Sequence, residues 1–486
     1  MIRQLFPLFL CCIILIPSNL LGQKKFYWNP SSDNLAGNAA NWHAGICTGL
    51  IGLPGKKDSI FFTGCSSPNP DCTVNITLNV AYVELTSSYT GTVTMNGGKK
   101  LIFKTGNFKG GVFSGSNGAI NANNSLTIDG CNFTSCSGFL TVKGSFSFIS
   151  GNFSHNNGTM VFKSGSISNN SGTSLNLNKL EFQGLGFNYT VNGNVSVYST
   201  LTTSQALSAK INAGNNGGTL ELFGDVQWNN TSINYGNITW KFSGSQTQSF
   251  SGTVEPVLYD VVINKTDYLL KLQKGFSVSH QLNLQSGFIV SDSLHPVIIL
   301  NGATVINASP GSFVRGAVRK VGNSSFQFPV GMGLRFRPIE ISAPSAVNDA
   351  FIAQYHESEQ PFGNKKESSL TYLSQCEYWS LNRTAGNSPV TVKLFWDAIT
   401  CDIDTLPGLR IARLNSFSKW VNAGNVSIEG NTMNGSIVTQ APQNSFSYYL
   451  IAKNSPGPVV NAGNDTMVCV GSSLKLGGYP VATGGR

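Results

Sequence analysis

The sequence has few charged residues and little of the composition that builds helices. Only 11% of its 486 residues are Asp, Glu, Lys or Arg, so the charged pairs that stabilise an exposed helix face are scarce. Gly, Ser, Thr and Asn instead separate short runs of β-branched and aromatic residues, which is typical of strands joined by turns. We therefore expect an all-β protein.

Motifs that carry common chemistry are also missing. Beyond residue 22 there is no Cys-x-x-Cys pair and the five histidines are far apart, which argues against a zinc site. There is no Gly-x-Ser-x-Gly elbow and no phosphate-binding loop. No cofactor is expected, although calcium in a structural role stays open, because Asp402 and Asp404 follow Cys401 and Glu357 and Glu359 follow His356.

Paired carboxylates are absent from the middle of the chain. Enzymes that cleave polysaccharides on a coil of strands need converging carboxylates. The acidic residues of this region are isolated, and none recurs at a fixed spacing: Asp129, Glu181, Glu221, Asp225 and Asp260. The sequence therefore predicts a non-catalytic region, with a β-helix lyase kept as a less favoured alternative.

Long hydrophobic runs are absent except at the start, where Leu5–Ile16 follows Arg3 and precedes the small residue Gly22. This pattern predicts a signal peptide over residues 1–22, with a membrane anchor as the alternative. We expect a secreted or cell-surface protein that meets a membrane only through export and attachment. The net charge is +9, and it becomes +8 without Arg3 (31 basic minus 23 acidic residues). The charges are scattered, so no nucleic-acid partner is expected.

Eight cysteines lie beyond residue 22, and an exported chain favours disulfides. We predict that Cys131 pairs with Cys136 and that Cys376 pairs with Cys401. One pair and one free thiol are expected among Cys47, Cys65 and Cys72.

The middle of the chain is loosely repetitive. A short strand closed by glycine recurs, and its markers Phe103, Phe162, Phe182, Phe223 and Phe242 are separated by 59, 20, 41 and 19 residues. These separations fit units of about 20 residues. Period-two alternation, as in Leu126-Thr-Ile-Asp-Gly130, places the apolar side chains on one face. We predict a right-handed parallel β-helix over residues 81–310, with a series of antiparallel sandwiches as the alternative.

Composition changes divide the rest of the chain. Residues 23–80, with Trp28 and Trp42, are expected to cap the coil. Residues 311–453 carry longer strands and three tryptophans (Trp379, Trp396, Trp420), which predicts a β-sandwich. Residues 454–458 form a proline-rich linker, and residues 459–486 are too few to bury a core alone.

The last segment resembles a known family. Val460-Asn-Ala-Gly-Asn-Asp-Thr-Met-Val-Cys469 and the residues up to Gly485 resemble the opening strands of a PKD-like immunoglobulin-type domain. Gly316–Asn323, Phe326–Gly331 and Tyr378-Trp379 resemble a module of large surface proteins exported by type IX secretion. The resemblance implies a truncated immunoglobulin-like domain at residues 459–486 and a longer multidomain protein.

These observations favour an adhesin-like structural or binding protein whose partners are extracellular glycans or host, matrix or cell-surface proteins. Trp228 and Trp240 are the candidate glycan contacts if they point outward, and inward packing is the favoured alternative because their neighbours are apolar. A carbohydrate-binding accessory region of a secreted polysaccharide-degrading enzyme is the second functional hypothesis.

Overall fold

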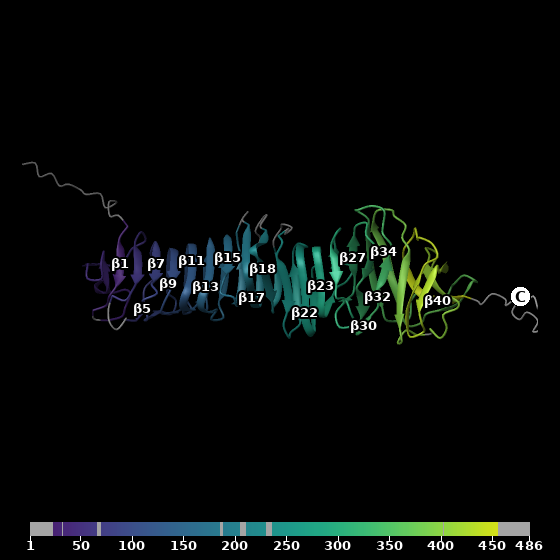
Figure 1. Ribbon diagram of the computed structural model, residues 1–486, viewed down its shortest axis with the longest axis horizontal. Helices are drawn as coiled ribbons and strands as arrows, with labels where there is room; N and C mark the ends of the chain where they lie inside the picture. Colours follow the sequence, from purple (N-terminus) through teal and green to yellow (C-terminus); the bar gives the residue numbers. More distant parts are fainter. Residues whose placement is uncertain are drawn as a thin grey trace, which may run out of the picture. The chain divides into compact units, whose positions relative to one another are not determined.

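The structure is a computed structural model (Figure 1) that describes residues 23–31, 33–65, 70–184, 188–204, 210–229, 236–401 and 403–454. Strands account for 58% of the described residues and helix for 1%, which confirms the all-β prediction. The chain divides into two compact units, residues 1–178 and 179–486. The predicted signal peptide, the predicted linker beyond Asn454 and the immunoglobulin-like segment lie outside the described residues.

The first unit is a coil in which most strands pair in parallel with the strand one turn later. Thr92 lies beside Val112, Val112 beside Asn132 and Asn132 beside Asn152, so these turns take 20 residues, and others in the unit take 21 to 23. This repeat length agrees with the prediction. The elements are β1 (Lys25–Trp28), η1 (Ala39–Asn41), β2 (Trp42–Ala44), β3 (Leu50–Ile51), β4 (Ser59–Phe62), β5 (Cys72–Val74), β6 (Leu78–Asn79), β7 (Tyr82–Leu85), β8 (Thr92–Met95), β9 (Lys100–Phe108), β10 (Val112–Ser114), β11 (Ala119–Thr134), β12 (Phe139–Val142), β13 (Ser145–Ser154), β14 (Thr159–Phe162) and β15 (Gly165–Asn169).

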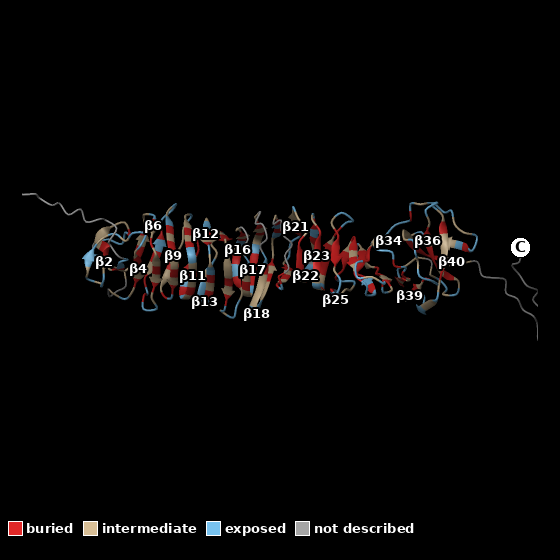
Figure 2. Ribbon diagram, turned by 90° about the horizontal axis from the view of Figure 1, so that it is seen from above, coloured by how far each residue is buried: buried red, intermediate tan, exposed pale blue. Residues whose placement is uncertain are grey.

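Apolar side chains from successive turns stack inside this coil. The ring of Phe133 lies 4.8 Å from that of Phe113 and 5.9 Å from that of Phe153, and the rings are close to parallel. Buried and exposed residues alternate along the strands, as Figure 2 shows. Gly130 turns a corner at φ +105°, a left-handed conformation that favours glycine. The alternation in the sequence therefore arises from the inside and outside of the coil.

The first residues of the unit fold back on the first strand. β1 pairs in parallel with β4 and antiparallel with β2, and β2 pairs with β3. Trp28 and Trp42 are buried, and their rings meet edge to face at 4.9 Å. A disulfide joins Cys47 to Cys65, while Cys72 is a buried free thiol. One pair and one free thiol is the pattern that the sequence predicted for these three cysteines.

The second unit begins with the same kind of coil. β16 (Leu175–Phe182) contains the point of division. From β17 to β26 the pairs that lie within the unit are parallel, so a β-solenoid forms and a series of antiparallel sandwiches does not. The strands are β17 (Tyr189–Thr203), β18 (Ile211–Leu222), β19 (Asp225–Trp228), β20 (Thr239–Ser243), β21 (Gln248–Gly252), β22 (Val257–Leu272), β23 (Phe276–Val290), β24 (Val297–Ile299), β25 (Thr304–Ile306), β26 (Val314–Arg315) and β27 (Val318–Val321).

The solenoid of the second unit continues directly into a β-sandwich. β27 pairs in parallel with β24 and antiparallel with β32, so coil-type pairing extends past residue 310 and the sandwich covers the edge of the last turn. One sheet contains β32, β34, β40, β36 and β37, and a separate sheet has the order β28-β31-β35-β39-β38. The strands are β28 (Phe326–Phe328), β29 (Val330–Met332), β30 (Arg335–Phe336), β31 (Ile339–Ile341), β32 (Ala350–His356), β33 (Leu370–Leu373), β34 (Tyr378–Ala385), β35 (Val392–Asp397), β36 (Leu409–Leu414), β37 (Trp420–Gly424), β38 (Ser427–Gly430), β39 (Asn434–Val438) and β40 (Tyr448–Asn454).

All three predicted tryptophans are buried, since Trp379, Trp396 and Trp420 are at most 3% exposed. Trp420 packs in a separate apolar cluster with Tyr378 and Leu450, on the face of the sheet opposite to Trp379. Within the described ranges, no helix has the length and apolar character needed to cross a lipid bilayer.

Candidate functional site

The two tryptophans proposed as outward glycan contacts point inward. Trp228 in β19 and Trp240 in β20 are fully buried, and their rings meet edge to face at 5.6 Å inside the second coil. Each occupies an inward position of the period-two pattern, because Val226 and Phe242 beside them are also buried. The favoured inward alternative is therefore confirmed, and the prediction of a glycan contact at these residues is wrong.

One of the two predicted disulfides forms and the other does not. Cys376 is bonded to Cys401 in the sandwich, whereas Cys131 and Cys136 are separate, buried thiols. β11 keeps the chain extended from Cys131 to Thr134, a span of about 10 Å, so the two cysteines do not meet across a tight turn. Burial raises the pKa of Cys131 to about 12, and the Cys136 Sγ instead lies 3.9 Å from Met95 Sδ.

The isolated acidic residues of the coils remain isolated in the structure. Among the residues that the structure describes, no group of three His, Cys, Asp or Glu side chains is arranged to hold a metal ion. The carboxylates bind neighbouring groups on the next turn or nearby: Asp129 with Ser150, Glu181 with Gln183, Glu221 with Lys241 and Ser243, Asp225 with the Ser249 amide, and Asp260 with His280. These contacts tie successive turns together.

The acidic residues singled out in the sandwich also have partners. Glu357 pairs with Arg335, and Asp404 pairs with Lys453. The His356 ring stacks on Tyr378 with centroids 4.5 Å apart, and burial lowers the pKa of His356. Asp402 lies outside the described residues.

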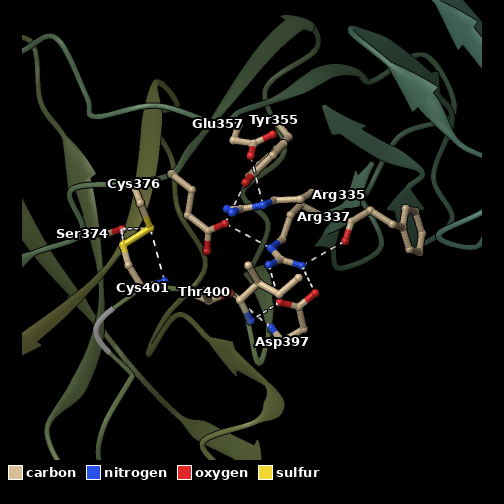
Figure 3. Close-up of polar contacts among 12 residues, drawn as sticks. Arg335, Arg337, Tyr355, Glu357, Ser374, Cys376, Asp397, Thr400 and Cys401 are labelled. Carbon is tan, nitrogen blue, oxygen red and sulfur yellow. Dashed lines mark hydrogen bonds and ion pairs between the residues drawn. A yellow bond between two sulfur atoms is a disulfide. The ribbon is translucent and has the colours of Figure 1, made fainter. Parts of the chain in front are cut away.

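A buried ion-pair network joins the two sheets of the sandwich (Figure 3). Arg337 follows β30, and its Nε donates to Glu377 Oε2 at 3.0 Å. Its two terminal nitrogens donate to the two oxygens of Asp397, at the end of β35, at 2.5 Å each. The Tyr355 hydroxyl, in the other sheet, donates to Glu377 Oε2 at 2.8 Å. We call these four residues the arginine clamp.

The arginine clamp is built as a structural connection. Arg337 and Glu377 are at most 2% exposed, so a substrate cannot reach them without rearrangement. Burial opposes the charge of Arg337, but the hydrogen bonds and charges of Asp397 and Glu377 outweigh it and raise the pKa of the guanidinium. The disulfide partners Cys376 and Cys401 flank the clamp in Figure 3.

The outer surface of the second coil carries an aromatic pair that the sequence interpretation missed. Tyr198 follows the inward residue Val197, and Phe223 follows the inward residue Leu222 one turn later. The two rings stack at 4.8 Å with planes only 9° from parallel, and Tyr198 is 46% exposed. The pair therefore places two stacked aromatic rings on the outer surface at one corner of the coil.

A hollow of about 640 Å³ opens beside this aromatic pair. We call it the corner groove, and its lining residues are Tyr198, Glu221, Phe223, Ser243, Gly244, Ser245, Gln246, Asn264 and Thr266. The lining residues come from four successive turns, because Tyr198 is in β17, Glu221 is in β18, Ser243 is in β20 and Asn264 is in β22. Successive turns of a parallel coil are about 4.8 Å apart, so the groove crosses about 14 Å of the surface.

Polar groups along the groove are held by the neighbouring turns. Glu221 Oε1 accepts from Ser243 Oγ at 2.8 Å and contacts Lys241 Nζ at 2.8 Å. Asn264 Oδ1 accepts from Ser286 Oγ at 3.0 Å, which leaves the two N–H bonds of its amide for a ligand. The groove thus combines an aromatic face with carboxylate, amide and hydroxyl groups in fixed positions.

Two features keep the floor of the groove in place. Gly244 has φ +96°, and a Cβ added there would lie 3.1 Å from Phe223 Cδ1, so glycine allows the chain to pass close under the ring. Beneath the floor, Lys265 is fully buried and its Nζ donates to the carbonyl oxygen of Ser243 at 3.1 Å and to Gln248 Oε1 at 2.8 Å. Burial lowers the pKa of Lys265 to about 8.

A partly exposed aromatic pair flanked by oriented hydrogen-bonding groups suits a ligand with both apolar and hydroxylated surfaces. Sugars have this character, because one side of the ring presents C–H groups and the edges present hydroxyls. The groove holds no arrangement of two converging acid–base groups, since Glu221 is the one titratable carboxylate among its lining residues. It is therefore a candidate binding site.

The signal that could have revealed the groove is a break in alternation. In Val195-Ser-Val-Tyr198 and in Leu220-Glu-Leu-Phe223, an apolar inward residue is followed directly by an aromatic residue. Period-two alternation cannot place both on the inside. The sequence interpretation used Phe223 only as a marker of the repeat, and the buried residue of that turn is Leu222.

The fold places the chain among β-solenoid proteins that continue into a β-sandwich. No family model matches it, and neither the curated proteins nor the solved structures that were compared contain a match.

Proposed function

We propose that this chain is a secreted or cell-surface, adhesin-like protein that binds extracellular glycans through the corner groove and is not catalytic in this region. The single observation that carries the proposal is the solvent-facing stack of Tyr198 and Phe223 beside the carboxylate of Glu221 and the amide of Asn264. The solenoid provides a rigid surface on which such a site is already formed.

Export is part of the same proposal. The disulfides Cys47–Cys65 and Cys376–Cys401 indicate an oxidising environment. Together with the N-terminal pattern of residues 1–22, they support secretion to the cell surface. We also propose, from the sequence resemblance alone, that the chain is part of a type IX secretion substrate with a PKD-like domain at residues 459–486.

The same groove would serve a carbohydrate-binding accessory region of a polysaccharide-degrading enzyme. The two functions differ in what is attached to the chain and in whether the ligand is degraded. A β-helix lyase is disfavoured, because the acidic residues of the described coils contact structural partners and do not converge. Lyase action would release an unsaturated, ultraviolet-absorbing product from an acidic polysaccharide.

The test is a screen of the full chain against immobilised glycans and extracellular-matrix proteins. We expect saturable binding to at least one glycan, and loss of that binding in Phe223→Ala. The matched control is Tyr27→Ala, because Tyr27 and Phe61 form a similar stacked pair on adjacent parallel strands of the first unit, at 5.3 Å. Binding to matrix proteins alone, or glycan binding unchanged in Phe223→Ala, would show that the groove is not the glycan site.

A further inference from the structure

We infer that the corner groove selects uncharged glycans over acidic ones, although the chain carries a positive net charge. This inference rests on the proposed function and concerns the ligand of the same site. Its basis is the charge of the groove: no Lys, Arg or His is among the nine residues that line it. A carboxylated or sulfated sugar would lose hydration in the groove and would find no cation there to compensate.

The cation that contacts the groove residue Glu221 is already neutralised. Lys241 Nζ lies 2.8 Å from Glu221 Oε1, and both side chains are partly buried, at 30% and 25% exposure. An acidic ligand would have to compete with Glu221 for this lysine, and it would bring a second negative charge close to the first. A like-charge contact of this kind favours rejection of the acidic ligand.

The second cation near the groove is out of reach. Lys265 lies directly below the floor but is fully buried. Its ammonium donates to the carbonyl oxygens of Ser243 and Gly244 and to Gln248 Oε1. These contacts use its three N–H bonds, so Lys265 has none left to donate to a ligand. The backbone of Ser243 and Gly244 lies between the ligand and the ammonium.

A neighbouring acidic residue of the same coil, Asp260, also contacts a basic side chain. His280 Nδ1 lies 2.6 Å from Asp260 Oδ1, and the His280 ring stacks on Tyr259 at 4.6 Å. Two acidic side chains of the described surface, Glu221 and Asp260, thus contact a basic side chain on the next turn. The positive net charge of the chain is not concentrated at this site.

The direction of the groove adds a length requirement. Its polar groups follow the coil axis from Glu221 to Ser243 and on to Asn264, one turn at a time. A single sugar stacked on Phe223 cannot also reach Asn264, which is two turns, or about 10 Å, away. The groove accordingly fits an oligosaccharide better than a monosaccharide, with its chain parallel to the coil axis.

The experiment measures binding of the full chain to neutral oligosaccharides, uronic-acid oligosaccharides and amino-sugar oligosaccharides of matched length by calorimetry. We expect the best neutral glycan to bind at least about tenfold more tightly than its uronic-acid counterpart. The neutral complex should weaken little between low and high salt, because screening affects charged ligands most.

Two lysine variants test whether the missing cation causes the selectivity. Thr266→Lys adds a cation at the exposed rim of the groove and should improve binding of the uronic-acid glycan selectively, whereas Thr304→Lys adds the same charge on the same face away from the groove lining and should not. Tighter binding of the acidic or amino-sugar series by wild-type protein, lost in Phe223→Ala, would overturn the inference and leave the glycan-binding proposal intact. Absence of binding to all three series would contradict the proposed function itself.

Discussion

The ammonium of Lys265 lies 2.8 Å from Gln248 Oε1 inside the second coil, where a lysine replaces the apolar residue expected at an inward position. Gln248 Nε2 in turn donates to the carbonyl oxygens of Leu222 and Gly224. This buried polar chain connects the turns that form the floor of the corner groove. It also makes the stability of the coil depend on pH.

The prediction for Lys265 concerns alkaline pH. Its pKa is about 8 in the folded chain, below the value of about 10.4 of an unperturbed lysine, so between these values the unfolded chain binds more protons than the folded one. Stability therefore rises as the pH increases through this window, by at most about 3 kcal/mol. The stability of wild type relative to Lys265→Met, measured by thermal unfolding, should therefore increase as the pH rises across the window. A Lys271→Met control changes an exposed lysine of the same strand, and a constant difference between wild type and Lys265→Met would contradict the assignment.

Breaking the arginine clamp should destabilise the fold far more than breaking an exposed ion pair. Arg337→Met leaves Glu377 charged and buried without its cation, which should lower the free energy of unfolding by about 3–5 kcal/mol. Lys393→Met breaks a pair in which Glu429 is 67% exposed and should cost no more than about 1 kcal/mol. Chemical denaturation of the two variants makes the comparison. Equal losses in the free energy of unfolding would mean that the clamp does not stabilise the packing of the two sheets.

Cysteine labelling tests the disulfide assignment. In native protein without reductant, Cys72, Cys131 and Cys136 should resist alkylation, because all three are buried and burial raises the pKa of each thiol. After unfolding without reductant, these three should become labelled while Cys47, Cys65, Cys376 and Cys401 stay protected. Peptide mapping by mass spectrometry gives the result. A linked Cys131–Cys136 peptide would contradict the structure.

The coil could be predicted from the sequence because the inward-facing apolar residues recur with the spacing of the turns. Phe103 and Phe162 were expected to be three turns apart, and the register runs from Phe103 through Ala122 and Val142 to Phe162. Alternation placed Leu126 and Ile128 on the inside, where they are fully buried. Such local patterns determine the fold, since each strand needs only one apolar face.

The candidate site was not predicted, because it depends on whether an aromatic residue next to a corner points into the coil or out of it. Trp228 and Phe223 are five residues apart and both aromatic, yet the first is fully buried and the second faces the groove. Their difference is set by the position of the turn at Gly224, which composition does not reveal. The pairing of Cys131 with Cys136 failed for a related reason, because a short spacing suggested a turn where the strand is extended.

The decisive measurement for glycan binding in the corner groove is a crystal structure of the full chain bound to the neutral oligosaccharide that binds best. We predict density for the ligand in the corner groove, with one sugar ring against the Tyr198–Phe223 stack and hydroxyl groups within hydrogen-bond distance of Glu221 and Asn264. Density for the sugar elsewhere on the molecule, with the groove empty, would contradict it.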